Sequence, residues 1–533
     1  MLTRFRCLFL GLGLLLAAGL GAPIHAQTTF TVTTTDNNTV HGNFIGADAP
    51  GPPAAGKHTA SDGAAGSFFG IAVALDGPRA LVGAVVADAG AADAGAVYVF
   101  EREGDQWQET ARLVPDAVQQ QAFFGNRVAL DGDRALVGAR STGFAYVFDR
   151  IAGQWQQTAR LEPSVAGEGL GQWVALDGDR AAGSSNNAGE GAVYLFERQP
   201  GGAWMEVARL VSPDPQDGDF FGFNVSLDGD RLLAGVRFHD DAADDQGAAY
   251  VFDLIDGAWQ HTATLAPDGA DVLDTFGTGV FLLGDRLLVG APGDDDQADN
   301  AGAVYVFDFI DGQWQRTAKL TAADGQAGDA MGTSVAFRGD RLLASAHFED
   351  DNGDNAGAVY VFDFIDGQWQ QTDKLTASDG QDFDNFGIAV DFNGGWGLFG
   401  APFDDDQGED AGAVYVFDLN RAPSAASITS PVDGATVLLA GDQTTPLVFA
   451  WTEAGDPDGD AVDYTWQLAA DASFTNVIFF DDIPASEGST LFVTDVGAMT
   501  QLLRDRGITA FPVVLFHRVL TSDGQATAEG PVA

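Results

Sequence analysis

Short apolar runs separated by turn residues recur along most of the chain at nearly constant intervals. One of them is Gly302-Ala-Val-Tyr-Val-Phe307, and seven of the eight tyrosines occupy the same place in a run of this kind. Successive tyrosines of this set lie 48 to 56 residues apart. They are Tyr98, Tyr146, Tyr194, Tyr250, Tyr305, Tyr360 and Tyr415. Because self-similarity at a nearly fixed period is typical of repeat architectures, the sequence predicts seven structural repeats.

Each repeat contains four runs with the length and composition of β-strands. A Phe-Gly pair, such as Phe276-Gly277, or a close variant opens each repeat, and Asp-Gly-Asp, such as Asp131-Gly132-Asp133, marks a tight hairpin between the first two strands. The tyrosine strand is apolar on both faces, as burial between neighbouring sheets requires. The fourth strand carries a tryptophan, such as Trp314. Four antiparallel strands repeated seven times predict an all-β chain with a seven-bladed β-propeller over residues 56–420.

The two ends of the repeat region predict how the ring closes. The seventh repeat has no tryptophan strand, because Asn420-Arg-Ala-Pro423 begins a linker. Ahead of the first repeat, however, Lys57-His-Thr-Ala-Ser-Asp-Gly63 matches Lys374-Leu-Thr-Ala-Ser-Asp-Gly380 of the sixth. We therefore expect residues near Lys57 to pair beside the Tyr415 strand, which would cover an otherwise open sheet edge.

The repeats resemble a known family. The run from Phe276-Gly277 through Leu287-Leu-Val-Gly-Ala-Pro292 to Gly302-Ala-Val-Tyr-Val-Phe307 looks like an FG-GAP repeat, and the likeness covers about residues 56 to 418. That family forms integrin-α-type propellers and occurs in many bacterial exported proteins. The resemblance implies a propeller of that type that takes part in recognition or adhesion.

The parts outside the repeats have different patterns. Residues 1–26 combine two arginines, an apolar run and a small-residue cleavage site, which is typical of a signal peptide. Residues 27–55 are expected to be an irregular lead-in. Residues 421–533 contain strand-like runs, one of which ends at Trp451, a predicted core residue, and they resemble a fibronectin-III or immunoglobulin-like β-sandwich. The only cysteine, Cys7, lies in the signal, which favours the fibronectin-III type. The last strand-like run is short, so more chain is expected beyond Ala533.

Acidic residues greatly outnumber basic ones and restrict the partners. The chain has 77 Asp and Glu against 26 Lys and Arg, a net charge of −51, and only three lysines, Lys57, Lys319 and Lys374. Such a surface repels nucleic acid and anionic membranes and suits cations, basic partners or a salty medium. No run after the signal is long enough to insert into a membrane. We expect a monomer that is secreted, periplasmic or held at the cell surface.

The acids concentrate in the loops between the second and third strands of the last four repeats. Clustered carboxylates in short loops suit Ca²⁺, which takes 6–8 oxygen ligands. The candidate ligands are Asp240, Asp241, Asp244, Asp245, Asp294, Asp295, Asp296, Asp299, Asp350, Asp351, Asp354, Asp404, Asp405, Asp406 and Asp410. The alternative is a solvated acidic rim. The calcium-binding motif of the integrin repeats is missing from the hairpins here, so the family's ligands are not carried over.

Motifs for catalysis are missing from the sequence. It contains no Gly-x-Ser-x-Gly elbow, no phosphate-binding loop and no histidine pairing of the metal-binding type. The sequence therefore predicts a protein that is not an enzyme and has no cofactor other than calcium. We expect an exported recognition or adhesion scaffold whose acidic propeller face binds a protein or surface partner. Two alternatives stay open, a carbohydrate-binding, lectin-like propeller and a propeller hydrolase or lyase.

Overall fold

The chain divides into two units, residues 1–50 and 51–533, in a computed structural model. The structure describes residues 31–33, 39–41, 54–104, 106–185, 190–240, 243–267, 272–421, 425–430, 444, 446–456, 462–469, 474, 477–483, 491–506, 515–522 and 527–529. The predicted signal, 1–26, lies outside these residues. In the first unit, β1 (Thr31–Thr33) and β2 (Thr39–His41) form a two-stranded antiparallel sheet, so the lead-in is not wholly irregular. Its strands are rich in β-branched residues, which favour this conformation.

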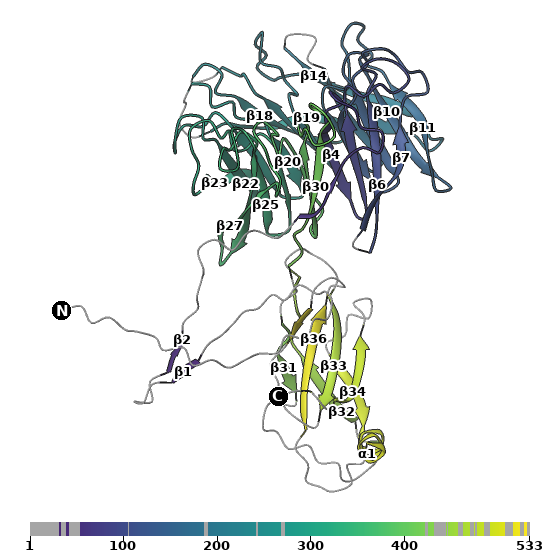
Figure 1. The fold of residues 1–533 in the computed structure, drawn as a ribbon, viewed down its shortest axis with the longest axis vertical. Coiled ribbons are helices and arrows are strands. Elements are labelled where there is room, and N and C mark those ends of the chain that lie inside the picture. The colour runs from purple at the N-terminus through teal and green to yellow at the C-terminus, as the bar shows by residue number, and fades with distance from the viewer. Residues whose placement is uncertain are drawn as a thin grey trace, which may run out of the picture. The chain divides into compact units, whose positions relative to one another are not determined.

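Residues 54–418 form seven four-stranded antiparallel sheets (Figure 1). The first three sheets consist of β4 (Phe69–Asp76), β5 (Arg79–Ala84), β6 (Ala96–Glu103) and β7 (Gln106–Leu113); β8 (Phe124–Asp131), β9 (Arg134–Ala139), β10 (Phe144–Ile151) and β11 (Gln154–Leu161); and β12 (Val174–Asp177), β13 (Arg180–Ser185), β14 (Ala192–Arg198) and β15 (Trp204–Leu210).

The fourth to sixth sheets consist of β16 (Val225–Asp228), β17 (Arg231–Val236), β18 (Ala248–Ile255) and β19 (Ala258–Leu265); β20 (Val280–Leu283), β21 (Arg286–Ala291), β22 (Ala303–Ile310) and β23 (Gln313–Leu320); and β24 (Val335–Arg338), β25 (Arg341–Ala346), β26 (Ala358–Ile365) and β27 (Gln368–Thr376). The seventh sheet has β28 (Ala389–Phe392), β29 (Trp396–Ala401), β30 (Ala413–Asp418) and β3 (Ala54–His58). Repeated four-stranded sheets of this kind fit a β-propeller, and the chain is all-β with almost no helix.

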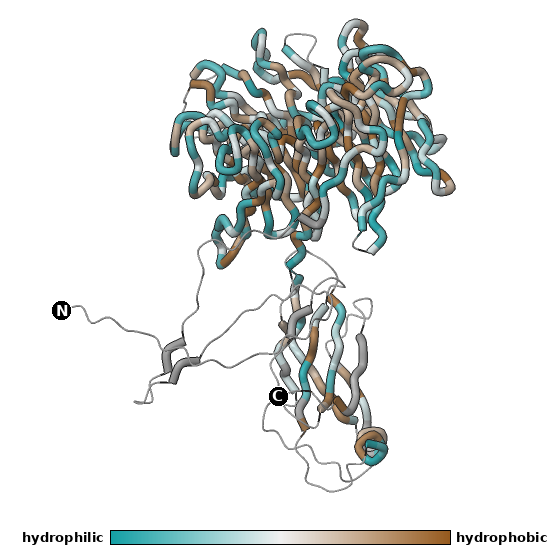
Figure 2. Tube along the Cα trace, viewed as in Figure 1, coloured by the Kyte–Doolittle hydropathy of each residue, from teal (hydrophilic) through white to brown (hydrophobic). Residues whose placement is uncertain are grey.

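Burial explains why the middle strands are apolar on both faces. The second and third strands of each sheet are almost wholly buried between neighbouring sheets. Figure 2 shows hydrophobic residues gathered inside the repeat region and hydrophilic ones mostly in its outer loops. All seven tyrosines of the repeat are buried. The fourth strands alternate exposed and half-buried residues, as in β11, because one of their faces meets solvent.

Glycines of the repeat allow neighbouring sheets to approach closely. Gly95, with a φ of 82°, forms a bridge with Phe124 of the next sheet. A side chain on Gly95 would bring its Cβ to 2.0 Å from the Phe124 carbonyl oxygen. The glycine before each tyrosine strand therefore contacts the Phe-Gly pair that opens the next sheet, which explains why the two runs recur together.

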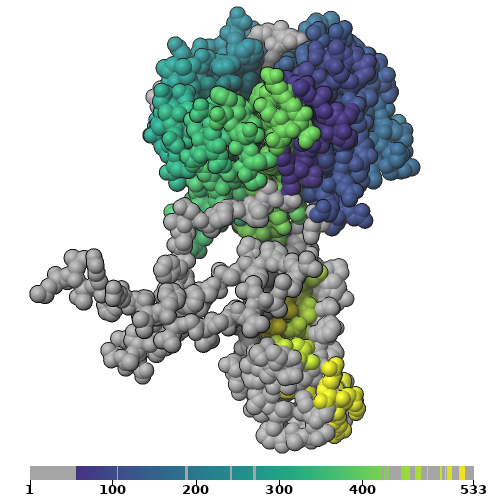
Figure 3. All heavy atoms as spheres, viewed as in Figure 1, coloured from purple at the N-terminus to yellow at the C-terminus, as the bar shows by residue number. Residues whose placement is uncertain are grey.

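The two ends of the repeat region meet in one sheet. The first strands of successive sheets contact one another in order, and β28 of the seventh sheet contacts β4 of the first. In the seventh sheet, β3 pairs antiparallel with β30, with Lys57 opposite Tyr415 and His58 opposite Val414. This confirms the predicted pairing, and Figure 3 shows the purple start of the repeat region beside its light green end.

The C-terminal part has two antiparallel sheets and one helix. One sheet contains β31 (Ile428–Ser430), β32 (Pro446–Trp451) and β35 (Leu491–Asp495); the other contains β34 (Val477–Ile483), β33 (Asp463–Ala469), β36 (Phe516–Ser522) and β37 (Thr527–Glu529). Both sheets and helix α1 (Val496–Asp505) contribute to one apolar cluster around the buried Trp466. Trp451 is buried there, as predicted, whereas the sequence analysis missed α1. Among the described residues, no helix has the length and apolar character that a membrane crossing requires.

Candidate functional site

The acidic loops between second and third strands are closed by their own carboxylates. In the fifth sheet, Asp295 Oδ1 accepts a hydrogen bond of 2.5 Å from the backbone N–H of Asn300. Asp240, Asp350 and Asp405 accept the same bond, at 2.6 to 2.7 Å, from the residue five positions later. That later residue has a φ of 53° or 54° in all four loops. These four aspartates therefore hold a tight turn, which explains one part of the acidic pattern without a metal.

A second acidic position in these loops is buried beneath the tyrosine strand. Asp294 and Asp404 are 3% and 1% exposed, and each carboxylate accepts a hydrogen bond from a tyrosine, at 2.8 Å from Tyr305 and 3.0 Å from Tyr415. Glu349 is the equivalent in the sixth sheet and is 1% exposed. Buried carboxylates require a cation or hydrogen bonds to compensate their lost hydration.

The cations are the three lysines of the chain. Lys319 Nζ lies 2.6 Å from Asp294 and 2.5 Å from Asp296. Lys374 Nζ lies 2.9 Å from Glu349, 2.6 Å from Asp351 and 2.8 Å from Asp324.

Lys57 repeats this arrangement at the ring closure. Its Nζ lies 2.6 Å from both Asp404 and Asp406 and 2.9 Å from Asp379. Each lysine is the cross-strand neighbour of a repeat tyrosine, as Lys57 is of Tyr415. We call the three sets, each of one lysine, one tyrosine and the acids around them, the lysine cages.

Electrostatics favour the charged lysine in each cage. Burial alone would lower the pKa of the Lys319 ammonium, but its hydrogen bonds with Asp294 and Asp296 outweigh this effect and raise the pKa above its ordinary value. The same balance raises the pKa of Lys57 and of Lys374. Burial, and then the hydrogen bond with Asp294, raise the pKa of the Tyr305 hydroxyl. The ammonium group is therefore the permanent counter-ion of these carboxylates.

The structure does not bring the predicted calcium ligands together around one empty point. Some of them contact lysines, namely Asp294, Asp296, Asp351, Asp404 and Asp406, and others close the loops. Asp244, Asp299 and Asp354 are exposed, Asp245 and Asp410 are partly exposed, and Asp241 lies outside the described residues. In the described part of the chain, no group of three or more His, Cys, Asp or Glu side chains is arranged to hold a metal ion. Calcium binding at these loops stays a prediction.

Other sheets replace the lysine with arginine or with neutral groups. In the first sheet Arg112 lies 2.8 Å from Asp62, which also accepts a hydrogen bond of 2.5 Å from Tyr98. In the third sheet Arg209 lies 2.6 Å from Glu168. The fourth sheet has Thr264 opposite its tyrosine. The sequence analysis missed the lysine cages. The three lysines occupy the same place in the repeat, directly before a leucine or a histidine, and this shared position was the signal that could have indicated them.

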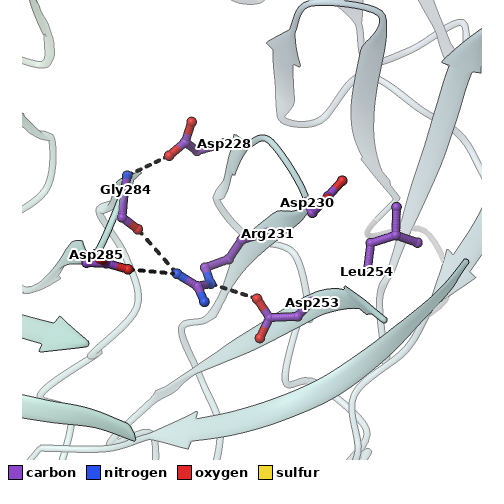
Figure 4. Close-up of a pocket in the computed structure, with 7 residues that line it drawn as sticks. All are labelled: Asp228, Asp230, Arg231, Asp253, Leu254, Gly284 and Asp285. Carbon is purple, nitrogen blue, oxygen red and sulfur yellow. Dashed lines mark hydrogen bonds and ion pairs between the residues drawn. The ribbon is translucent and has the colours of Figure 1, made fainter. Parts of the chain in front are cut away.

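The opposite ends of the sheets carry a different device, built from the Asp-Gly-Asp-Arg hairpins. Asp228 accepts a hydrogen bond of 2.5 Å from the backbone N–H of Gly284 in the next sheet (Figure 4). Arg231 donates to the Gly284 carbonyl at 3.3 Å and to Asp253 at 2.7 Å. Together with Asp285 these residues line a hollow of about 330 Å³. Because the aspartates and the arginine around this hollow bond to one another and to the backbone, we interpret them as a clamp that joins two sheets and not as a ligand site.

Removing the carboxylate of this clamp should destabilise the protein. Asp228→Ala is expected to lower the free energy of unfolding by about 1.5–3 kcal/mol, since a charge-assisted hydrogen bond between sheets is lost. Chemical denaturation of both proteins measures the difference. The control is Asp217→Ala, an exposed aspartate, which should change stability by less than about 0.5 kcal/mol. Equal effects of the two substitutions would refute the clamp.

Comparison with known proteins places these features in a family. The FG-GAP repeat matches residues 55–100, 107–148, 204–252, 259–307, 314–362 and 369–417. No curated protein is similar to the chain in sequence. A solved protein from Lactobacillus plantarum has 14% identity and a TM-score of 0.41, over 66% of this chain and 92% of that one. The periplasmic gluconolactonase of Pseudomonas aeruginosa has 15% identity and a TM-score of 0.41, over 58% and 86% of the two chains.

One prediction is contradicted by these neighbours. Besides the Pseudomonas protein, a Bacteroides fragilis structure with 13% identity and a TM-score of 0.41, over 58% of this chain and 85% of that one, is named as a 6-phosphogluconolactonase. The prediction that the chain is not an enzyme is therefore wrong as an inference from missing motifs, and it is withdrawn. At such identity, the neighbours' activities are not transferred to this chain. The six repeat matches cover more than half of the residues, and the chain belongs to the FG-GAP repeat family.

Proposed function

We propose that the seven four-stranded sheets are the blades of one closed, seven-bladed propeller of residues 56–420, followed by a fibronectin-III-like sandwich of residues 421–533. The contact of β28 with β4 supports the closure, and the apolar cluster shared by the two C-terminal sheets supports the sandwich. The signal-like residues 1–26 support export to the bacterial surface or surroundings.

We further propose that the chain is a recognition scaffold whose acidic face binds a basic protein partner. The observation that carries this proposal is the contrast within each acidic loop. Asp295 closes the turn, and Lys319 pairs with Asp294 and Asp296. The exposed Asp299 forms no ion pair with a described lysine or arginine. Carboxylates on preorganised loops lose little conformational entropy when they bind, and their potential steers a cationic partner.

The exposed loop acids can be tested against an equal number of acids on the other face. Asp244, Asp299 and Asp354 are exposed in the loops between second and third strands. Replacing all three with Asn should weaken binding of a short oligolysine peptide about tenfold at 0.15 M salt, since each rim charge contributes roughly 0.5 kcal/mol. Fluorescence anisotropy of a labelled peptide measures the affinity.

The matched control removes three charges from the hairpins between third and fourth strands. Asp256, Asp311 and Asp366 are exposed there and have a φ of 52°, which asparagine tolerates. Their triple replacement with Asn should change the affinity less than about twofold. If both triple variants weaken binding equally, net charge alone attracts the peptide. If a neutral glycan binds and the peptide does not, the carbohydrate-binding alternative replaces this proposal.

A further inference from the structure

Two arginines and two aromatic rings contact one another in a row across the second, third and fourth sheets. The Arg127 guanidinium carbon lies 3.7 Å from the centre of the Trp173 ring, and the rings of Trp173 and Phe223 lie 5.8 Å apart. The guanidinium carbon of Arg237 lies 5.2 Å from the centre of the Phe223 ring. We call these four residues the arginine ladder. It joins the second, third and fourth sheets and ends in a guanidinium at both sides.

The two arginines of the ladder lack the acidic partners that other arginines of the chain have. Arg231, for example, pairs with Asp253 at 2.7 Å. Neither Arg127 nor Arg237 forms an ion pair with any described residue, and the Nε of each is buried without a hydrogen-bond partner there. Within the described part of the chain, the Arg127 side chain donates a single hydrogen bond, of 2.7 Å, to the backbone oxygen of Asn126. Among the described residues, neither cation is therefore paired with an anion, and Asp245 acts on Arg237 only through its charge, without an ion pair.

Further positive charge adds to this environment. Burial, and then the charge of Arg140, lower the pKa of Arg127 to about 10. Burial, and then the charge of Arg237, lower the pKa of His347 to about 4, so this histidine stays neutral at pH 7. His347 follows a strand of the sixth sheet and Arg237 one of the fourth, so the charge of Arg237 acts on a residue of another sheet. The ladder is therefore a positive region inside a strongly acidic protein.

We propose that the arginine ladder is a binding site for a small carboxylate with an aromatic or other planar body. A guanidinium group donates two parallel hydrogen bonds to a carboxylate, and the aromatic rings offer faces for the planar part. All four residues are partly exposed, although the Nε atoms of both arginines are buried. Because neither arginine forms an ion pair with a described acid, both remain available to an added anion. This site is independent of the acidic face, whose partner has the opposite charge.

The arginine ladder could serve only to stabilise the fold through its arginine–aromatic contacts. Measurements of stability distinguish that role from a role in binding. If the arginines only support the fold, Arg127→Gln with Arg237→Gln must destabilise the protein. If the arginines instead serve to bind an anion, removing these two unpaired charges should leave the melting temperature unchanged or higher. A clear fall in the melting temperature of the double variant would thus count against the proposal.

Binding is tested on the full chain with benzoate, benzyl alcohol and inorganic phosphate as probes, by isothermal titration calorimetry at 0.15 M NaCl. Benzoate should bind saturably and at least about tenfold more tightly than benzyl alcohol, which has no charge, and than phosphate, which has no planar body. Arg127→Gln with Arg237→Gln should weaken benzoate binding at least about tenfold. Arg102→Gln is the matched control, because Arg102 also stacks on a tryptophan, at 4.8 Å from Trp396, and it should leave the affinity unchanged. No benzoate binding to the parent, equal binding of benzyl alcohol, or an equal loss in the control would overturn the site.

Discussion

A chain that begins at residue 59, and therefore lacks β3, is expected to melt about 5 °C or more below a chain that begins at residue 51. The deletion removes the pairing of β3 with β30 and leaves the tyrosine strand as an open edge. It also removes Lys57, the counter-ion of Asp404, which is 1% exposed. An unpaired buried carboxylate and an open strand together should cost at least about 5 kcal/mol. Differential scanning calorimetry measures the melting temperatures.

Two controls divide this effect into its parts. The chain that begins at residue 51 keeps the whole second unit, so it should melt with the full-length protein. Lys57→Met keeps the strand and removes only the charge, so it should reproduce part of the loss. The open edge should also cause self-association, which light scattering detects. If the shorter chain melts within about 2 °C of its control and stays monomeric, β3 does not close the seventh sheet in solution.

The sequence was sufficient for the strand pattern and for the pairing of β3, for a physical reason. The four strands of a repeat are contiguous in the chain, so their turns and alternation are local signals. The match between the text at Lys57 and at Lys374 then identified two segments with the same structural role. By contrast, α1 follows β35 without a turn and contains a glycine, Gly497, so its local signal is weak. Its helix depends on packing of Met499 and Leu503 in the C-terminal core.

The acidic loops could be found in the sequence, but their chemistry could not. Asp294, Asp295 and Asp296 are identical in type, yet one is buried beneath a tyrosine, one closes the turn and one meets Lys319 at its exposed end. These roles depend on which residue lies opposite in the neighbouring strand, and Lys319 is 23 residues away from Asp296. The number of carboxylates in these loops suggested calcium, because the sequence alone did not show which lysine lies beside which loop.

Lys374→Met is expected to destabilise the protein by about 3–5 kcal/mol at pH 7, because it breaks a buried ion pair and leaves the other charge in place. Methionine has nearly the same length as lysine, so the change removes charge rather than volume. Glu349 would remain 1% exposed with no cation, and its second oxygen, Oε2, already lacks a hydrogen-bond partner among the described residues. Urea denaturation of parent and variant measures the loss.

Three further measurements show whether the buried charge of Glu349 causes that loss. Burial already raises the pKa of Glu349 above its ordinary value despite the lysine, and removing the lysine raises it further. Since the folded variant then binds a proton more tightly than the unfolded chain, its deficit should shrink as the pH falls from 7 toward 5. Adding Glu349→Gln should restore about half of the lost stability, because the glutamine carries no charge. Ca²⁺ should stabilise Lys374→Met more than the parent, since only the variant has carboxylates without a cation in this cage. A deficit below about 1 kcal/mol that does not change with pH would mean that the lysine cages are surface ion pairs of little energetic consequence.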